Sequence, residues 1–130
     1  MAQGSGVVTG GSVTATKKIN TNLSSKEQYL VNINTSDDAY IALAAGATLP
    51  LFVLKEGADG SSTETVGTIV LFGPTKVKLG GTVTPGAHLT SDGSGLAIAT
   101  TTSGNRVAGI ALAAGVANDV IPMLAIPSVY

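Results

Sequence analysis

The sequence predicts an all-β fold, a small β-barrel or sandwich of short antiparallel strands with an extended N-terminal arm. From Tyr29 onward, turn-forming residues recur about every 8–12 residues, and apolar runs of strand length lie between them. No stretch shows a clear helical period. Glycine accounts for 17 of the 130 residues and aromatic residues for only 4%, which suits short strands separated by tight turns.

Residues 1–25 are predicted to form a flexible N-terminal arm, and residues 26–130 a single β-barrel domain. Glycine, serine, threonine and valine dominate the arm, a composition typical of extended, flexible segments. One interpretation is a disordered terminus, and the other is an arm that becomes ordered on a partner surface. Because Lys17 and Lys18 stand beside Ile19, the second interpretation favours an acidic, partly apolar groove as the surface bound.

The strands of the domain are expected where β-branched and apolar residues run between turns. Gly73-Pro74 is expected to break the most strand-like run, which resumes with lysines on one face and apolar residues on the other. Pro85-Gly86 fits the centre of a type II turn, and Ser91–Gly95 is expected to reverse the chain. The best candidate for a helix lies near Ala111–Ala117. Strands are expected at Tyr29–Ile33, Tyr40–Leu43, Leu49–Leu54, Val66–Phe72, Thr75–Leu79, Leu96–Thr102, Val107–Ala113 and Val120–Ile126.

Two parts of the chain share one pattern, an apolar strand, a loop of small residues and a second apolar strand. The first part joins Leu51–Gly57 to Val66–Phe72, and the second joins Val107–Ala113 to Val120–Ile126. We expect two hairpins that pack as the two halves of one barrel.

Composition and charge exclude several classes of protein. The chain has no cysteine, so we expect neither a disulfide framework nor a thiolate metal site. No apolar run reaches the ~18 residues of a transmembrane helix, and the first residues lack the pattern of a secretory signal. A net charge of -1 does not indicate the basic surface that proteins use to bind nucleic acid. Because charged residues make up only 12% of the chain, we expect copies of the chain or a partner to cover part of its surface.

Candidate catalytic groups are few, and no enzyme, cofactor or metal is expected. His88 is the only histidine, and no Gly-x-Ser-x-Gly motif marks a nucleophile, so its expected role is a surface or inter-subunit hydrogen bond. Asp37-Asp38 is expected to cap backbone N–H groups in a turn. Glu56, Asp59 and Glu64 surround a glycine-rich loop and are the candidate ligands for Ca²⁺, although their spacing is not that of an EF-hand.

The stretch from residue 67 to residue 124 resembles a known protein family. It reads GTIVLFGPTKVKLGG at 67–81, VTPGAHLTSDGSG at 83–95, NRVAGIALA at 105–113 and DVIPML at 119–124. This cadence of strands and turns is similar to that of the small β-barrel decoration, or cement, proteins encoded beside tailed-phage capsid genes and of the related DUF2190-type family. With FVLKEGA at 52–58, the resemblance covers about residues 50–126.

The resemblance implies a structural protein, made in the host cytoplasm, that binds the outer surface of a phage head as a homotrimer. Its partner there is the major capsid protein, which it clamps against internal pressure. The arm has no fixed counterpart in the family. From the arm's own composition, Lys17, Lys18 and Ile19 are the candidate capsid-binding residues of this chain. Tyr130 is expected to be either a frayed tail or an anchor into a neighbouring subunit.

Two other functions remain open at this point. A head-fibre or tail-associated module that binds a receptor or a glycan would present exposed aromatic residues in a groove. A hydrolase would need a pocket around His88 with carboxylates nearby.

Overall fold

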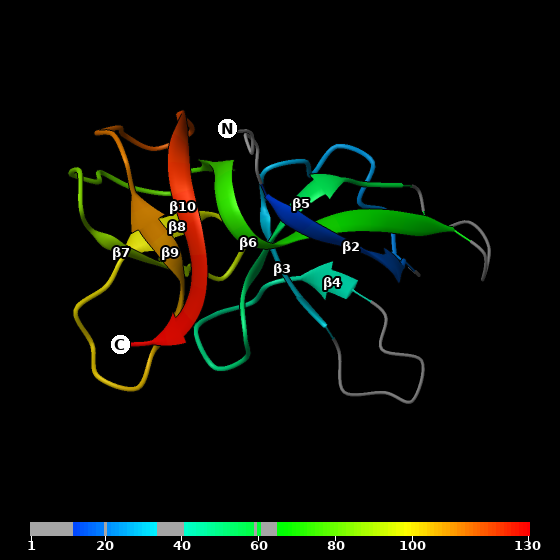
Figure 1. Cartoon of the computed structure of the whole chain (residues 1–130), viewed down its shortest axis with the longest axis horizontal. Helices are drawn as coiled ribbons and strands as arrows, with labels where there is room; N and C mark the ends of the chain where they lie inside the picture. Colours follow the sequence, from blue (N-terminus) through cyan, green and yellow to red (C-terminus); the bar gives the residue numbers. More distant parts are fainter. Residues whose placement is uncertain (1–11, 20, 34–40, 59, 61–64) are drawn as a thin grey trace, which may run out of the picture.

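A computed structural model describes residues 12–19, 21–33, 41–58, 60 and 65–130. The described residues form an all-β structure without helices, which confirms the predicted fold class (Figure 1). No helix among them could span a bilayer. The strands are β2 (Val13–Lys18), β3 (Leu30–Ile33), β4 (Ile41–Leu43), β5 (Phe52–Glu56), β6 (Val66–Lys78), β7 (His88–Ser91), β8 (Ala97–Ala99), β9 (Arg106–Ala111) and β10 (Val120–Val129).

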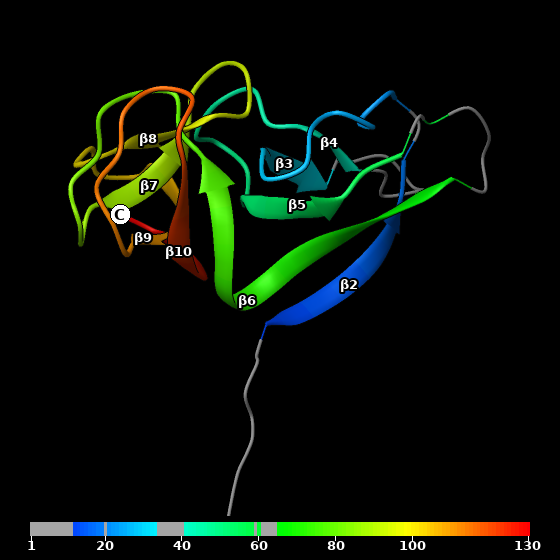
Figure 2. The same ribbon diagram turned by 90° about the horizontal axis from the view of Figure 1, so that it is seen from above.

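The long strand β6 connects the two halves of the molecule. The strand order is β4-β3-β5-β6-β10-β9-β7-β8, and β2 also pairs with β6. The first part of β6 pairs with β2 and β5, and the second part, from Gly73, pairs with β10. In Figure 2 the strand turns sharply between these two parts. β2 lies along the first part and β10 along the second. The result is an antiparallel sheet curled into a partial barrel.

The turn in β6 corrects the expected strand break at Gly73-Pro74. β6 runs without interruption through both residues. Gly73 has a φ of 112°, a backbone conformation that favours glycine and that bends the strand. Pro74 lies opposite Leu124 of β10, and a proline fits a ladder position that requires no N–H. Gly73-Pro74 therefore redirects the strand and does not end it.

The second half of the molecule closes on itself. Leu79, just after β6, forms a parallel bridge with Ala97 of β8, and Gly80 N–H donates to the Ala97 carbonyl at 2.8 Å. The path β6-β10-β9-β7-β8 thus returns to the end of β6. Both expected hairpins are present, because β5 pairs with β6 and β9 pairs with β10, each antiparallel. They belong to one barrel because β6 also pairs with β10.

The buried side chains form two clusters of mostly aliphatic residues. The larger cluster draws on both halves, for example Val53 and Val70 from one half and Leu89 and Met123 from the other. The smaller cluster lies under β2 and β4 and consists of Ile19, Leu23, Val31, Ile41, Leu54 and Ile69. Burial of these aliphatic groups is the main source of stability available to a chain without disulfides.

The prediction of a helix near Ala111–Ala117 is wrong. Ala111 ends β9, and the residues after it form a bridge with Val83. Val83 N–H donates to the Gly115 carbonyl at 2.9 Å, and Gly115 N–H donates to the Val83 carbonyl at 3.1 Å. Because these backbone groups are used across the barrel, they are not available for helical hydrogen bonds.

The segment expected to be an arm is in part a strand of the sheet. Residues 1–11 and 20 lie outside the described residues, so the expectation is compared with the structure only from Ser12 onward. Val13–Lys18 form β2, which pairs with Val66–Phe72 of β6. Leu23 is also buried. Thr14, Thr16 and Lys18 are exposed while Ala15 and Lys17 are half-buried, which is the alternation of a strand with one covered face.

Candidate interaction surfaces

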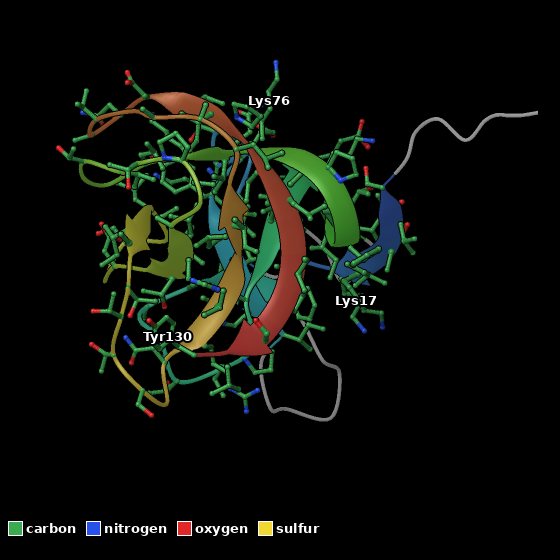
Figure 3. All side chains as sticks on the ribbon, turned by 60° about the vertical axis from the view of Figure 1, so that its left-hand side comes forward. Lys17, Lys76 and Tyr130 are labelled. Carbon is green, nitrogen blue, oxygen red and sulfur yellow. The ribbon has the colours of Figure 1, made fainter. Side chains whose placement is uncertain are left out.

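The three candidate capsid-binding residues do not share one environment. Ile19 is fully buried, and its backbone N–H donates to the Thr65 carbonyl at 2.9 Å. Its side chain packs where Gly67 leaves room, because a Cβ at Gly67 would collide with the Ile19 side chain. Lys18 is exposed on β2. Lys17, which is labelled in Figure 3, is half-buried on the same strand. Only the two lysines therefore remain available to a partner.

Two groups of exposed apolar side chains stand out on the described surface, which also exposes Leu49, Val66, Val129 and Tyr130. At the turn of β6, Val13 and Phe72 pair directly across β2 and β6, and their exposed fractions are 55% and 53%. The second group consists of Leu112 and Val116 in the connection from β9 to β10 and of Val120 at the start of β10, at 53%, 54% and 44% exposure. Several large apolar groups exposed together are typical of surfaces that bind other proteins.

The connection between β9 and β10 is held firmly although its apolar side chains are exposed. The Asp119 carboxylate accepts a hydrogen bond from Val116 N–H at 2.9 Å, and the Asp119 carbonyl accepts one from Leu79 N–H at 2.8 Å. Asn118 adopts a φ of 73°, as expected for a turn residue. Leu112 and Val116 are thus presented on an ordered backbone, so binding a partner would cost little ordering entropy.

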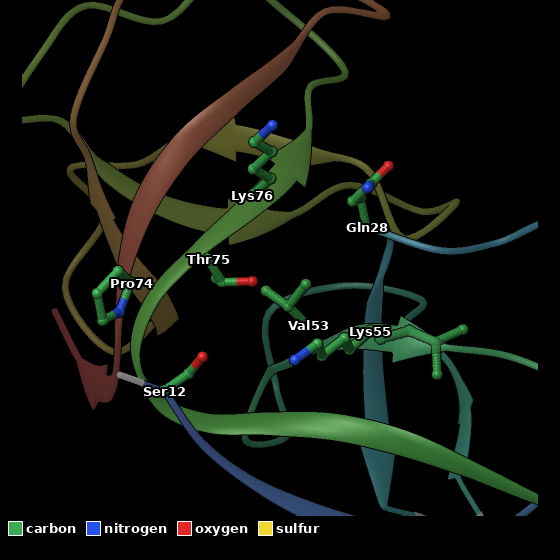
Figure 4. Close-up of a pocket in the computed structure, with 8 residues that line it drawn as sticks. Ser12, Gln28, Val53, Lys55, Pro74, Thr75 and Lys76 are labelled. Carbon is green, nitrogen blue, oxygen red and sulfur yellow. The ribbon is translucent and has the colours of Figure 1, made fainter. Parts of the chain in front are cut away.

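A pocket of about 260 Å³ lies at the turn of β6 (Figure 4). It opens because β5 pairs only with the first part of β6, while the second part turns away toward β10. Val53, which is buried, contributes to its wall, and Lys55 and Lys76 lie at its rim. The residues that line it are Ser12, Gln28, Val53, Leu54, Lys55, Pro74, Thr75 and Lys76.

Positive charge gathers around this pocket. Lys55 and Lys76 line it, and the Nζ atoms of Lys26 and Lys78 lie 4.7 and 5.5 Å from the centre of the Tyr29 ring, next to Gln28. No described lysine forms an ion pair with a described carboxylate. Lys55 and Lys76, which line the pocket, are therefore free to bind an anionic group.

His88 shows no catalytic arrangement within the described residues. Its side chain is exposed, and its ring packs edge-on against the Tyr130 ring, with centroids 5.3 Å apart and an interplanar angle of 86°. The Tyr130 backbone pairs with the 103–105 turn, because Tyr130 N–H donates to the Asn105 carbonyl at 2.8 Å. The end of the chain is thus docked on its own domain, and its aromatic ring remains 44% exposed.

The candidate metal ligands are only partly described. Glu56 is exposed, and one of its carboxylate oxygens accepts a hydrogen bond of 3.4 Å from the Thr68 hydroxyl. Asp59 and Glu64 lie outside the described residues, as do Asp37 and Asp38. The described residues contain no group of three or more His, Cys, Asp or Glu side chains that could hold a metal ion.

Sequence reasoning missed the pocket because its residues come from four separate segments. Only the pair Gly73-Pro74 provides a signal, and it favours a strand break. The period-two pattern places Lys76 and Lys78 on one face of a strand, but no local pattern places Gln28 and Lys55 beside them.

Comparison with known proteins identifies a similar fold. No family model and no curated protein matches the chain, so its membership of the DUF2190-type family is not supported by a matching model. A solved structure does match, the crystal structure of the N base of head fiber gp8.5 in bacteriophage phi29. The TM-score is 0.68 at 21% sequence identity, over 91% of this chain and 97% of the phage chain. The two proteins share a fold.

Proposed function

We propose that this chain is a structural protein of a tailed-phage head, which binds the outer surface of the capsid as a homotrimer and stabilises the shell. The observation that carries the proposal is the fold shared with the phi29 head fiber base over 91% of the chain. The resemblance of residues 50–126 to capsid decoration proteins, found independently in the sequence, supports the same location.

The surface of the domain supports a role in assembly. Phe72 and Val13 form one exposed apolar pair, and Leu112, Val116 and Val120 form the second exposed group. Such side chains are costly to leave in water, and contact with other copies or with the capsid would cover them. We propose these two places as the contacts with neighbouring copies and with the major capsid protein. Lys17 and Lys18 of β2 remain proposed contacts with the capsid.

Binding only to the assembled shell would explain how such a protein stabilises it. A protein that binds the lattice, and not free capsid subunits, shifts the equilibrium toward the lattice by mass action. Three linked copies convert weak single contacts into strong attachment, because the second and third contacts form at high effective concentration. Neither step requires a cofactor or a catalytic group.

A second candidate function is the base module of a head fibre. The matched protein is described as the base of a head fiber, which favours this alternative over a tail-associated one. In that case the domain would attach to the head and carry a further receptor- or glycan-binding part. Both candidates place the chain on the outside of the virion, and they differ in whether attachment stabilises the shell.

The proposal is tested on purified shells that lack this protein. We expect the added protein to co-sediment with shells, to saturate and to raise the temperature at which the shells disrupt. Binding without a rise in that temperature would favour the fibre base. Absence of binding would contradict both candidates.

Matched variants locate the binding surface. Leu112→Glu combined with Val116→Glu places two charges on the β9–β10 connection and is expected to weaken binding to shells. Thr101→Glu, which adds a charge at another exposed position, is the control and is expected to bind as the unmodified protein does.

A further inference from the structure

One edge of β6 has backbone groups without a strand partner. In an antiparallel ladder, a residue directs its N–H and C=O either toward the neighbouring strand or away from it, in alternation. Pro122 of β10 lies opposite Lys76. The Pro122 carbonyl accepts a hydrogen bond from Leu112 N–H at 3.0 Å, so the polar groups of Pro122 face away from β6. Pro122 and Lys76 therefore form a non-hydrogen-bonded pair, and the N–H and C=O of Lys76 point away from β10.

Lys78 confirms this direction. It lies two residues beyond Lys76, and its N–H donates at 2.8 Å to the carbonyl of Gln28, a residue that lines the pocket. By the same alternation, the N–H and C=O of Lys76 and the C=O of Pro74 point toward the pocket. No described residue forms a hydrogen bond with them on that side. The pocket thus contains a short open edge of the sheet. This edge offers one backbone donor, the Lys76 N–H, and two backbone acceptors, the carbonyls of Lys76 and Pro74.

The surroundings of this edge define what would fit it. Val53 provides an apolar wall, and Lys55 and Lys76 provide positive charge at the rim. A β-strand directs alternate side chains to opposite sides, so an added segment would direct apolar residues to the wall and acidic residues to the lysines.

We propose that the edge at Pro74–Lys76 binds an extended, acidic segment of a partner protein as an added strand. The first eleven residues of this chain contain no Asp or Glu, so charge complementarity argues against them as the occupant. A carbonyl of the segment accepts from Lys76 N–H, and N–H groups of the segment donate to the Lys76 and Pro74 carbonyls. The proposal stands independently of the role at the phage head.

The test uses the full chain, labelled with ¹⁵N, and two synthetic hexapeptides. The acidic probe alternates Asp and Val and is acetylated and amidated at its ends, and the control probe replaces each Asp with Asn. We expect the acidic probe to cause saturable amide shifts at 74–78, 53–55 and Gln28. The Asn probe is expected to bind at least about threefold more weakly, since it lacks the charge pairs.

Variants separate the contribution of charge from that of the backbone. Lys55→Gln combined with Lys76→Gln is expected to weaken binding about three- to tenfold. Lys17→Gln combined with Lys18→Gln, the matched control on β2, is expected to change it less than twofold. Lys76→Pro also removes the Lys76 N–H, which β10 does not use, and is expected to bind more weakly than Lys76→Gln.

Four results would overturn the proposal. They are the absence of saturable shifts, equal binding of the Asp and Asn probes, shifts centred elsewhere on the domain, and equal effects of the two double lysine variants. If the same amides shift with protein concentration in the absence of peptide, the occupant is a second copy and not a partner protein. Peptide-free spectra of each variant verify that the fold is retained.

Discussion

Ile19 lies at the end of a stretch whose composition is that of a flexible segment, and its side chain is fully buried. It packs with Val31, Ile41 and Ile69 in the smaller core cluster. Composition describes the average behaviour of a segment, while a single aliphatic residue next to a matching gap decides where the segment docks. Here the gap is provided by Gly67, which leaves room for the Ile19 side chain.

Replacing Ile19 with alanine tests this anchoring role. Ile19→Ala is expected to lower the free energy of unfolding by about 2–5 kcal/mol, because it removes buried methylene and methyl groups and leaves a cavity. Denaturant unfolding monitored by circular dichroism measures the change. The control Thr14→Ala, at an exposed position on the adjacent strand β2, is expected to cost less than about 0.5 kcal/mol. Equal losses for the two variants would contradict the anchoring role.

Asp92 organises the turn between β7 and β8. Its Oδ1 accepts hydrogen bonds from Ser94 N–H at 2.8 Å and from Leu96 N–H at 3.0 Å. Asp92→Ala leaves both donors without this acceptor and is expected to cost about 1–2 kcal/mol of stability. Thermal unfolding measures it, with the exposed Ser94→Ala as the control. A loss no larger than that of the control would show that the turn holds without the carboxylate.

Residues whose conformation is chemically restricted could be placed from the sequence. Gly86 has a φ of 86°, as the predicted type II turn at Pro85-Gly86 requires, and Ser91–Gly95 reverses the chain as expected. The burial of Ile19 could not be predicted, because it depends on a gap 48 positions further along the chain. Local chemistry determines turns, while burial depends on what folds nearby.

At the scale of elements, β2 and β6 show what a strand needs in addition to its own sequence. β2 carries alternating small and polar residues, which would be marginal alone. Six register pairs with β6 hold it in the sheet. Without β2, the edge of β6 over Val66–Phe72 would be open to pairing with other chains.

Deletion of residues 1–18 removes β2 and tests its contribution. At about 0.2–1 kcal/mol for each of the six cross-strand pairs, we expect a loss of about 1–6 kcal/mol and greater aggregation on heating. Calorimetry and light scattering measure the two effects. The matched truncation of residues 1–11 retains all of β2 and isolates its contribution. Identical unfolding temperatures for the two truncations would contradict a stabilising role for the strand.

Most strands of the domain could be predicted, because their apolar runs and turn residues are contiguous in the sequence. Two of the predictions that fail have one cause. Pairing with distant strands decides the conformation both at Gly73-Pro74, where a strand break is predicted, and near Ala111–Ala117, where a helix is predicted. β10 accepts Pro74 without a lost hydrogen bond, and Val83 holds the residues around Gly115 in a bridge.

At the scale of the whole molecule, the exposed apolar residues and the 12% charged content predict association. If the folded state is a trimer, dilution favours unfolding, because one folded particle gives three unfolded chains. We expect the melting temperature to rise roughly 5–10 °C over about a hundredfold range of concentration. Calorimetry across that range, with native mass spectrometry for stoichiometry, checks it. A melting temperature that is independent of concentration would indicate a stable monomer.

The candidate surfaces could be predicted only in part. The low charge predicts that copies or a partner cover part of the surface, and this stays a prediction; on β2, Lys18 is exposed and Lys17 is half-buried. The pocket required the turn of β6, which brings Lys76 next to Lys55 and Gln28. A sheet edge left open by a bend has no local sequence pattern. It depends on which neighbouring strands separate from the bent strand, and those strands lie elsewhere in the sequence.

The bent strand also limits how such a protein can evolve. Val70 and Val77 lie on either side of the bend and belong to the same core cluster. A genetic exchange that breaks the gene within β6 would join two half-strands selected against different neighbours. The two halves therefore cannot be exchanged separately between related genes, and viable recombinants should exchange the whole domain.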